Sequence, residues 1–251
     1  MIIALIQARM GSTRLRGKVL MPLGGKPAID HVISRAKNAS QIDDVIVVTS
    51  IDPANLPLIH HVSGTGTRVF VGSEDDVLDR FWQATRLTRA AHIVRITADC
   101  PLLDPRVVDE VIKTHLEKEN DYTSNTDPPT WPDGLDVEVM KRSVLEAAWR
   151  ESSDQHDREH VTPFMRRNNT RFRLENVGSP RDLSHHRWTL DQDEDYQLLS
   201  RVFDEMTSTG ALWTTSQVLE FLDSHPELLH LNARIIRNEG SLKTQGNDRD
   251  E

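Results

Sequence analysis

Cysteine is almost absent from this chain of 251 residues, in which Cys100 is the single example. One thiol excludes an intrachain disulfide and a zinc site built from cysteines, and it agrees with a reducing compartment. Long apolar runs are missing as well, because no stretch reaches the roughly 18 residues that a membrane-spanning helix needs. The segment Met1–Gln7 has neither a basic flank nor a cleavage site of small residues, so a secretory signal is not predicted. We therefore expect a cytoplasmic protein that does not bind membranes.

The chain also has no excess of positive charge. The chain contains 30 Lys and Arg against 39 Asp and Glu, which gives a net charge of -9, whereas proteins that bind nucleic acids usually present a basic face. The composition therefore argues against a nucleic acid as partner. Residues 1–29 differ, since they contain five basic residues and no acidic one, which leaves a charge of -14 on the rest of the chain. A local basic pocket in an acidic protein favours a small anionic ligand.

The first half of the sequence alternates apolar strands with amphipathic helices. Strands are predicted over residues 2–8, 45–49, 68–71 and 92–97. Helices are predicted to begin near Pro27, after a cap formed by Ser73 with Asp76, and after the cap Asp104. The last of them is expected to run to about Glu119 with Leu116 facing inward. This alternation predicts an α/β fold with a Rossmann-like, mostly parallel central sheet and helices on both faces. In such a fold, ligands bind at the carboxyl ends of the strands.

The second half is less regular. We expect strands over residues 136–140, 172–177 and 187–190, and helices over 193–206 and 215–231. A further helix is expected to start at the cap Ser143 and to run through Trp149. The loop 125–134 contains too much proline for a helix or a strand, and loops of this length are often functional.

A glycine-containing basic loop, residues 7–18, directly follows the first strand. Glycines let backbone amides approach phosphate oxygens, hydroxyls donate hydrogen bonds, and Arg and Lys neutralise charge. The loop is not a Walker A motif, because five residues separate Gly11 from Gly17 where that motif has four, and Val19 stands where a Ser or Thr is needed. The absence of G-x-G-x-x-G also weakens a dinucleotide-binding interpretation. We interpret the loop as a phosphate-binding site, with a solvated basic turn as the alternative.

Two aspartates follow predicted strands. Asp99 comes after residues 92–97 and Asp191 after residues 187–190. Carboxylates at strand ends lie on the ligand side of the sheet, and one or two of them can hold Mg²⁺ when waters and substrate phosphates complete its coordination. Each aspartate alone is more typical of a helix N-cap. Their combination with a basic phosphate loop favours a metal site.

Three motifs, in this order along the chain, resemble the sugar-acid cytidylyltransferases, a family of CMP-sugar synthetases. They are Ile3–Lys18, Thr97–Leu102 and Leu183–Asp191. The chain looks most like the spore-coat polysaccharide biosynthesis branch, often labelled glycosyltransferase-like. The resemblance covers about residues 2–206 and departs from the family at Arg16, where proline is common.

The resemblance implies a nucleotidyltransferase whose single α/β domain spans residues 1–237. It further implies insertions for acceptor binding and dimerisation at about residues 120–186. A flexible tail is expected at residues 238–251 because Leu242 is their single large apolar residue. CTP and a sugar or sugar-acid acceptor are the implied substrates, Mg²⁺ is the implied cofactor, and a homodimer is the implied assembly. The preference for CTP rests on the resemblance alone.

From the motifs and the resemblance together we predict the site residues. Those expected to carry catalysis are Arg9, Arg14, Lys18, Asp99 and Asp191, with Asp99 and Asp191 as metal ligands. The nucleotide is expected to contact Gln7, Ala8, Arg9, Gly11, Ser12, Thr13, Arg14, Lys18, Thr49, Ser73, Arg95 and Thr97. The acceptor is expected to contact Asp133, Asp136, Glu138, Arg158, Glu159, His160, His185 and Arg187. The sequence identifies no dedicated general base, although Asp191 or a nearby histidine could accept the proton.

The segment His156–His160 matches H-x-x-E-H, the signature of inverted zincins. On a helix its two histidines would share one face. Against a zinc site, the match is short, Pro163 follows closely, and a peptidase has no use for a basic phosphate loop. The resemblance instead implies that the overlapping stretch Arg158–Pro163 is part of the acceptor-side wall.

The sequence thus predicts a Mg²⁺-dependent nucleotidyltransferase that activates a sugar or sugar acid with CTP and releases pyrophosphate, for surface polysaccharide or glycan biosynthesis. One alternative is a glycosyltransferase of GT-A-like fold that consumes a nucleotide sugar. Another is a non-catalytic module that senses a nucleotide, which would not need both Asp99 and Asp191.

Overall fold

The computed structural model describes residues 1–209 and 212–237. Its main element is a sheet of seven strands in the order β5-β4-β1-β6-β8-β7-β9. These strands are β1 (Ile2–Gln7), β4 (Asp44–Ser50), β5 (Arg68–Gly72), β6 (His92–Thr97), β7 (Tyr122–Ser124), β8 (Glu138–Lys141) and β9 (Leu174–Asn176). A separate short ribbon pairs β2 (Pro22–Leu23) with β3 (Lys26–Pro27).

The sheet is mostly parallel. β5, β4, β1 and β6 run in the same direction, β8 is antiparallel to both of its neighbours, and β9 is parallel to β7. The carboxyl ends of β1, β4 and β6 therefore lie at one edge, where Gln7 is in register with Val48 and Thr97. The predicted α/β, Rossmann-like architecture is confirmed.

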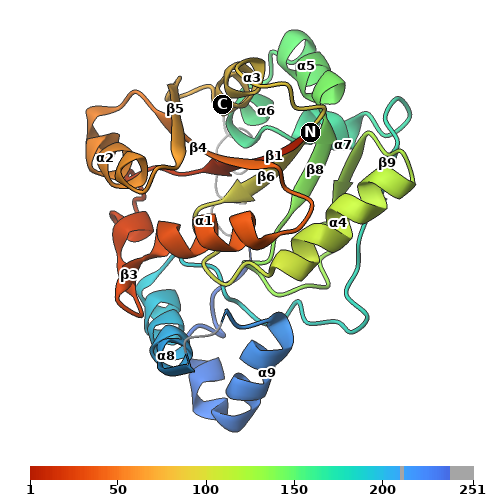
Figure 1. Cartoon of the computed structure of the whole chain (residues 1–251). Helices are drawn as coiled ribbons and strands as arrows, with labels where there is room; N and C mark the ends of the chain where they lie inside the picture. Colours follow the sequence, from red (N-terminus) through yellow and green to blue (C-terminus); the bar gives the residue numbers. More distant parts are fainter. Residues whose placement is uncertain (210–211, 238–251) are drawn as a thin grey trace, which may run out of the picture.

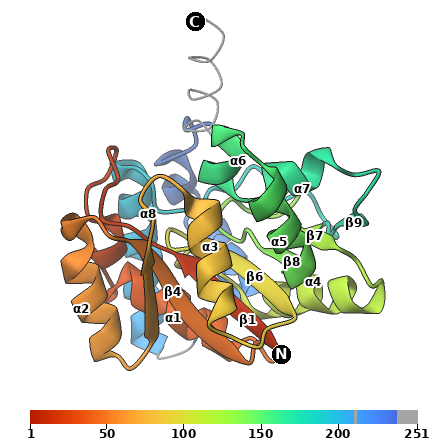
Figure 2. The ribbon, with the colours of Figure 1, turned by 90° about the horizontal axis from the view of Figure 1, so that it is seen from above.

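Helices cover both faces of this sheet (Figure 1). They are α1 (Ala28–Asn38), α2 (Leu56–Gly64), α3 (Val77–Arg86), α4 (Pro105–Glu117), α5 (Arg142–Glu151), α6 (Gln155–His160), α7 (Pro163–Arg167), α8 (Asp193–Thr209) and α9 (Thr215–Ser224). α1 and α4 lie on one face and α3 and α5 on the other, as Figure 2 shows from above. Because side chains alternate along a strand, β1 supplies both cores. Ile2, Ala4 and Ile6 pack toward α1 and α4, and Ile3 and Leu5 toward α3 and α5.

A third apolar cluster joins α8 and α9 to the body. It includes Trp131 and Trp188 from loops, Leu199 and Phe203 from α8, and Leu222 from α9. These side chains are buried. The cluster attaches the loop that leads to Asp191 to the rest of the protein, so it positions one side of the edge where the strands end.

Two predicted helix caps are confirmed and one is wrong. Asp76 and Asp104 accept hydrogen bonds from the backbone amides at the starts of α3 and α4. Ser143, by contrast, lies inside α5, whose N-cap is Lys141 without a side-chain hydrogen bond. The helix begins directly after β8, and the amide of its first residue, Arg142, donates to the backbone carbonyl of Ala91 over 2.9 Å instead of to a capping side chain.

Other predicted elements differ from the structure. Residues 187–190 do not form a strand, and the expected helix 215–231 ends at Ser224, before a 3-10 turn at Pro226–His230. Proline lacks the amide hydrogen that would continue the helix. Leu116 was expected inside but is 38% exposed. α2 and β7 had no prediction, and the expected tail 238–251 lies outside the described residues.

Among the described residues, no helix combines the length and the apolar character that crossing a membrane requires.

Gly134 marks a close approach between two loop backbones. Its φ of +108° is a conformation that side-chain-bearing residues rarely adopt. A Cβ at this position would lie 2.6 Å from the carbonyl carbon of Trp188 and 2.7 Å from the amide nitrogen of Thr189. A glycine is therefore needed to pack the proline-rich loop against the segment that leads to Asp191.

We predict that Gly134→Ala lowers the free energy of unfolding by about 1–3 kcal/mol, because both the backbone conformation and the contact become strained. Urea denaturation measures this loss. Gly66→Ala is the matched control, since Gly66 also has a positive φ but a methyl group there would meet no atom within 4 Å. Equal losses in the two variants would show that the close approach contributes nothing.

Candidate active site

Two cavities open at the sheet edge where β1 and β6 end. The first, of about 270 Å³, is the loop cavity, and it is lined by the basic loop together with Thr97, Ala98 and Asp99. The second, of about 390 Å³, is the wide cavity, and it extends toward β8, α6 and the C-terminal segment. Arg14, Thr97, Asp99 and Asp191 line both. The two cavities therefore adjoin at these side chains.

The basic loop has fixed ends and an open middle. The amide of Met10 donates to Oδ1 of Asn55 over 2.8 Å, and the amide of Gly17 donates to the carbonyl of Met10 over 3.2 Å. Gly17 has a φ of +67°, which turns the chain so that Lys18 points back into the site. Between these points, Gly11, Ser12 and Thr13 line the loop cavity with Arg9 and Arg14. This is the arrangement of amides, hydroxyls and cations that a chain of phosphates requires.

Lys18 connects the two predicted metal ligands. Its Nζ lies 3.0 Å from Oδ2 of Asp99 and 2.9 Å from Oδ1 of Asp191, and Arg14 contacts the other Asp191 oxygen over 2.6 Å. Burial alone would raise the pKa of each carboxyl, but Lys18, and Arg14 at Asp191, hold both pKa values below the usual range. Both aspartates are therefore ionised at neutral pH.

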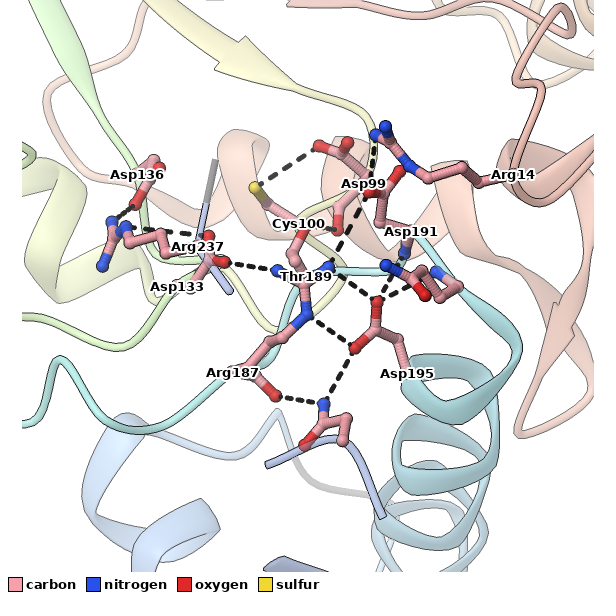
Figure 3. A network of polar contacts seen from close by, with 12 residues as sticks. Arg14, Asp99, Cys100, Asp133, Asp136, Arg187, Thr189, Asp191, Asp195 and Arg237 are labelled. Atoms are coloured by element: carbon pink, nitrogen blue, oxygen red, sulfur yellow. Dashed lines mark hydrogen bonds and ion pairs between the residues drawn. The ribbon is translucent and has the colours of Figure 1, made fainter. Parts of the chain in front are cut away.

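A buried network holds the segment before Asp191 in place, although this segment is not a strand (Figure 3). Asp195 accepts two hydrogen bonds of 2.9 Å from Arg187, and its Oδ2 also accepts from the backbone amides of Asp191 and Gln192. The amide of Leu190 donates to the carbonyl of Asp99 over 2.7 Å. These contacts fix the backbone of Asp191 beside that of Asp99, which is the proximity that the sequence predicted.

The two aspartates fit a magnesium ion. An oxygen of each lies within about 3 Å of one nitrogen, so both carboxylates face the same point, where a cation can lie between them, and both are ionised. Magnesium needs one or two carboxylates, with waters and phosphate oxygens as its remaining ligands. The described residues contain no cluster of three or more His, Cys, Asp or Glu that could hold a metal ion by themselves. The same finding gives no support to the zinc interpretation of His156 and His160, whose ring centroids lie 4.4 Å apart.

The wide cavity contains carboxylates that are already paired. Glu138 forms an ion pair with Arg95 and accepts hydrogen bonds from the hydroxyls of Tyr122 and Thr162. Asp136 contacts Arg237 over 2.6 Å, yet burial raises the pKa of Asp136 to about 7. Asp136 is therefore an ionisable group of the cavity that titrates near neutral pH.

Two nitrogen-containing side chains of the wide cavity, Arg166 and His160, still have hydrogen-bonding groups to offer a ligand. Arg166 forms no hydrogen bond or ion pair through its side chain within residues 1–209 and 212–237, unlike the other cavity arginines Arg14, Arg95 and Arg187. Burial lowers the pKa of His160, and its buried Nε2 lacks a hydrogen-bond partner in the same part of the chain. These two groups can still receive a polar ligand.

The structure brings most predicted site residues together. The loop cavity contains the predicted nucleotide residues of the basic loop and Thr97, while Arg95 lies in the wide cavity with Asp133, Asp136, Glu138, His160 and Arg187. The residues that line neither cavity are Thr49, Ser73, Arg158, Glu159 and His185. The hydroxyl of Ser73 accepts a hydrogen bond from the backbone amide of Asp76, and Arg158 forms an ion pair with the Asp76 carboxylate over 2.9 Å. Thr49 is buried inside β4, and His185 is exposed, with its ring tilted against that of His186.

Several cavity and network residues had no prediction. They are Cys100, Thr126, Arg166, Thr189, Asp195 and Arg237. Asp195 looks in the sequence like an ordinary acidic residue in the first turn of a helix. Arg237 reaches Asp136 across 101 positions, so no local pattern could reveal the contact.

Comparison with known proteins shows which family the chain resembles. A family model described as cytidylyltransferase matches residues 3–222. The chain is 34% identical over 239 residues to an uncharacterized protein of Methanocaldococcus jannaschii, covering 93% of this chain and 95% of that one. It is 31% identical over 233 residues to the spore coat polysaccharide biosynthesis protein SpsF of Bacillus subtilis, covering 90% and 95%. The structure of a cytidylyltransferase from Leptospira borgpetersenii matches with a TM-score of 0.87 at 28% identity, covering 94% of this chain and 99% of that one.

The match over most of the chain and the convergence of a basic loop with two ionised aspartates agree with each other, and the chain therefore belongs to the cytidylyltransferase family of nucleotidyltransferase enzymes.

Proposed function

We propose that the enzyme uses Mg²⁺ to transfer CMP from CTP to a hydroxyl of a sugar or sugar acid, with release of pyrophosphate, for surface polysaccharide or glycan biosynthesis. The observation that carries the proposal is the meeting of two cavities at Asp99 and Asp191. The name of the Bacillus subtilis relative supports the glycan role. The homodimer and the cytoplasmic location stay predictions of the sequence.

The loop cavity is assigned to the triphosphate. Arg9, Arg14 and Lys18 bring positive charge to the β- and γ-phosphates, and the amides and hydroxyls of residues 11–13 donate hydrogen bonds. The acceptor oxygen forms a bond to the α-phosphorus while the bond from this phosphorus to the bridging oxygen of the β-phosphate breaks, and the hydroxyl proton passes to Asp191 or to a nearby histidine. The negative charge that develops on the leaving pyrophosphate is the charge that these three cations neutralise.

Asp99 and Asp191 would hold the magnesium ion at the junction of the two cavities. A bound divalent ion would polarise the α-phosphate and lower the pKa of the acceptor hydroxyl. The aspartates themselves fix where the reaction occurs, because they are the point at which the ligands of both cavities meet.

The wide cavity is assigned to the acceptor, and its charges favour an acid over a neutral sugar. The guanidinium of Arg166 can bind a carboxylate through two parallel hydrogen bonds. Glu138 is neutralised by Arg95, and Asp136 is largely protonated below about pH 7, so neither strongly repels an anion at that pH. His160 offers a further hydrogen bond through Nε2.

The decisive experiment incubates the protein with CTP, Mg²⁺ and a panel of sugar acids and neutral sugars. Pyrophosphate release that depends on an acid acceptor supports the proposal. Release of a nucleoside diphosphate from a sugar nucleotide would instead establish the glycosyltransferase alternative, and binding of CTP without turnover would indicate a sensing module.

We predict that Asp99→Asn and Asp191→Asn each reduce kcat for pyrophosphate release by about 100-fold or more, on the scale seen when one electrostatic group of an active site is removed. Asp204→Asn, at an exposed position of α8 away from both cavities, is the matched control and should keep full activity. Circular dichroism verifies that the variants are folded. Full activity of either site variant removes that aspartate from the proposed machinery.

We further predict that the KM for an acidic acceptor rises by about threefold to tenfold as the pH rises from about 6 to 8. The pKa of Asp136 is raised, so its neutral form dominates below about pH 7 and its charged form, which repels an anion, dominates above. The KM for CTP should stay constant over this range. Asp136→Asn should have a pH-independent acceptor KM, and an unchanged pH dependence in this variant would contradict the assignment.

A further inference from the structure

The ammonium group of Lys18 lies where a cation shared by Asp99 and Asp191 would lie. It is within 3.0 Å of an oxygen of each aspartate, and the side chain is only 11% exposed. Neither carboxylate is fully buried, since their side chains are 29% and 16% exposed. The pair is therefore open to a cation from the cavities, but Lys18 already occupies the space between them.

The charges of this cluster are already balanced. Two carboxylates face one ammonium and the guanidinium of Arg14, which contacts Asp191 over 2.6 Å. Arg187 also approaches Asp191, over 3.7 Å, but two other aspartates already neutralise its charge. A divalent cation placed between the carboxylates would bring two further positive charges to within a few ångströms of Lys18. At such distances the repulsion costs several kcal/mol even with partial solvent screening. A divalent cation can bind well only when the ammonium has left.

Lys18 has an alternative anion to bind in the same place. It lines the loop cavity with Arg9, Ser12 and Thr13, where the phosphates are assigned. A triphosphate there would offer its oxygens to Nζ of Lys18. Because the lysine side chain is flexible, rotation about its own bonds is enough to move Nζ from the carboxylates to the phosphates. The exchange releases the two carboxylates to the cation without leaving a buried charge unpaired.

We propose that Lys18 is a positioning residue that occupies the cation site of the nucleotide-free enzyme and makes divalent-cation binding depend on the triphosphate. The inference rests on the proposed function for the identity of the nucleotide. In the free enzyme the ammonium holds Asp99 and Asp191 together and prevents their mutual repulsion. When the triphosphate binds, the same group moves to the phosphates, so one side chain links the two binding events. Such coupling between two ligands commonly amounts to roughly 5–150-fold in affinity.

The test is a titration of the nucleotide-free protein with Mn²⁺ alone. The electron paramagnetic resonance signal of the unbound ion measures how much Mn²⁺ stays free at each point. The wild type should bind Mn²⁺ weakly. Lys18→Met keeps an unbranched side chain one atom shorter and removes its charge, so it should bind Mn²⁺ about tenfold to a hundredfold more tightly. Lys18→Arg keeps the charge and should show little gain. The double variant Lys18→Met with Asp99→Asn should lose the gain, because the ion then lacks one of its carboxylates.

Lys26→Met is the control for a general change of net charge, since Lys26 is exposed and belongs to the same basic segment. Tight Mn²⁺ binding by the wild type, no gain in Lys18→Met, or an equal gain in Lys26→Met would each overturn the inference. Lys18→Gln provides a second variant if Lys18→Met does not fold, because its amide still donates to one aspartate. The thermal unfolding temperature should rise with Mn²⁺ in the neutral variants and not in the wild type.

Calorimetric titration of the wild type with CTP separates this inference from the proposed function. Failure to bind CTP would contradict the cytidylyltransferase assignment, whatever the Mn²⁺ titrations show. A gain of Mn²⁺ affinity in Lys18→Met would still establish the role of Lys18 at the cation site.

Discussion

The contact between one ammonium and two carboxylates determines how the active site is assembled. Lys18 lies 81 positions from Asp99 and 173 positions from Asp191 in the sequence, yet its Nζ is within 3.0 Å of both. The active site therefore needs three separate parts of the fold to lie next to one another. They are the loop after β1, the end of β6 and the segment before α8. Because parallel strands end at a common edge, the sheet brings the first two together.

The third part needs its own support, since it is not a strand. Asp195, completely buried, binds Arg187 and the amides of Asp191 and Gln192, and Gly134 lets a second loop pack against the same segment. The carboxylate of Asp195 thereby neutralises the buried charge of Arg187 and also gives the two backbone amides a hydrogen-bond acceptor. The chemistry at Asp191 thus depends on contacts that are made in the interior, behind the cavities.

The sequence predicts best where the physical cause is local. The apolar run of β1, the caps Asp76 and Asp104, and the loop without acidic residues each depend on neighbours along the chain, and each was identified. The convergence of Asp99 and Asp191 was also predicted, although for Asp191 the expected strand was wrong and hydrogen bonds to Asp99 and Asp195 hold the backbone instead. Arg95, expected beside the nucleotide, lines the wide cavity, where it pairs with Glu138, and it also donates to Gln7 of the loop cavity over 3.1 Å, so its contact with the nucleotide stays a prediction. Arg237 could not be found, because its partner Asp136 lies on a distant loop.

The central claim is that the loop after β1 holds a triphosphate while Asp99 and Asp191 share its cation. A crystal structure of the protein grown with CTP and Mn²⁺, with the ion located by its anomalous signal, tests this most directly. We expect one ion that contacts both carboxylates, the triphosphate along residues 11–18, and Nζ of Lys18 on a phosphate oxygen. A triphosphate bound away from this loop, or an ion that contacts neither aspartate, would contradict the claim.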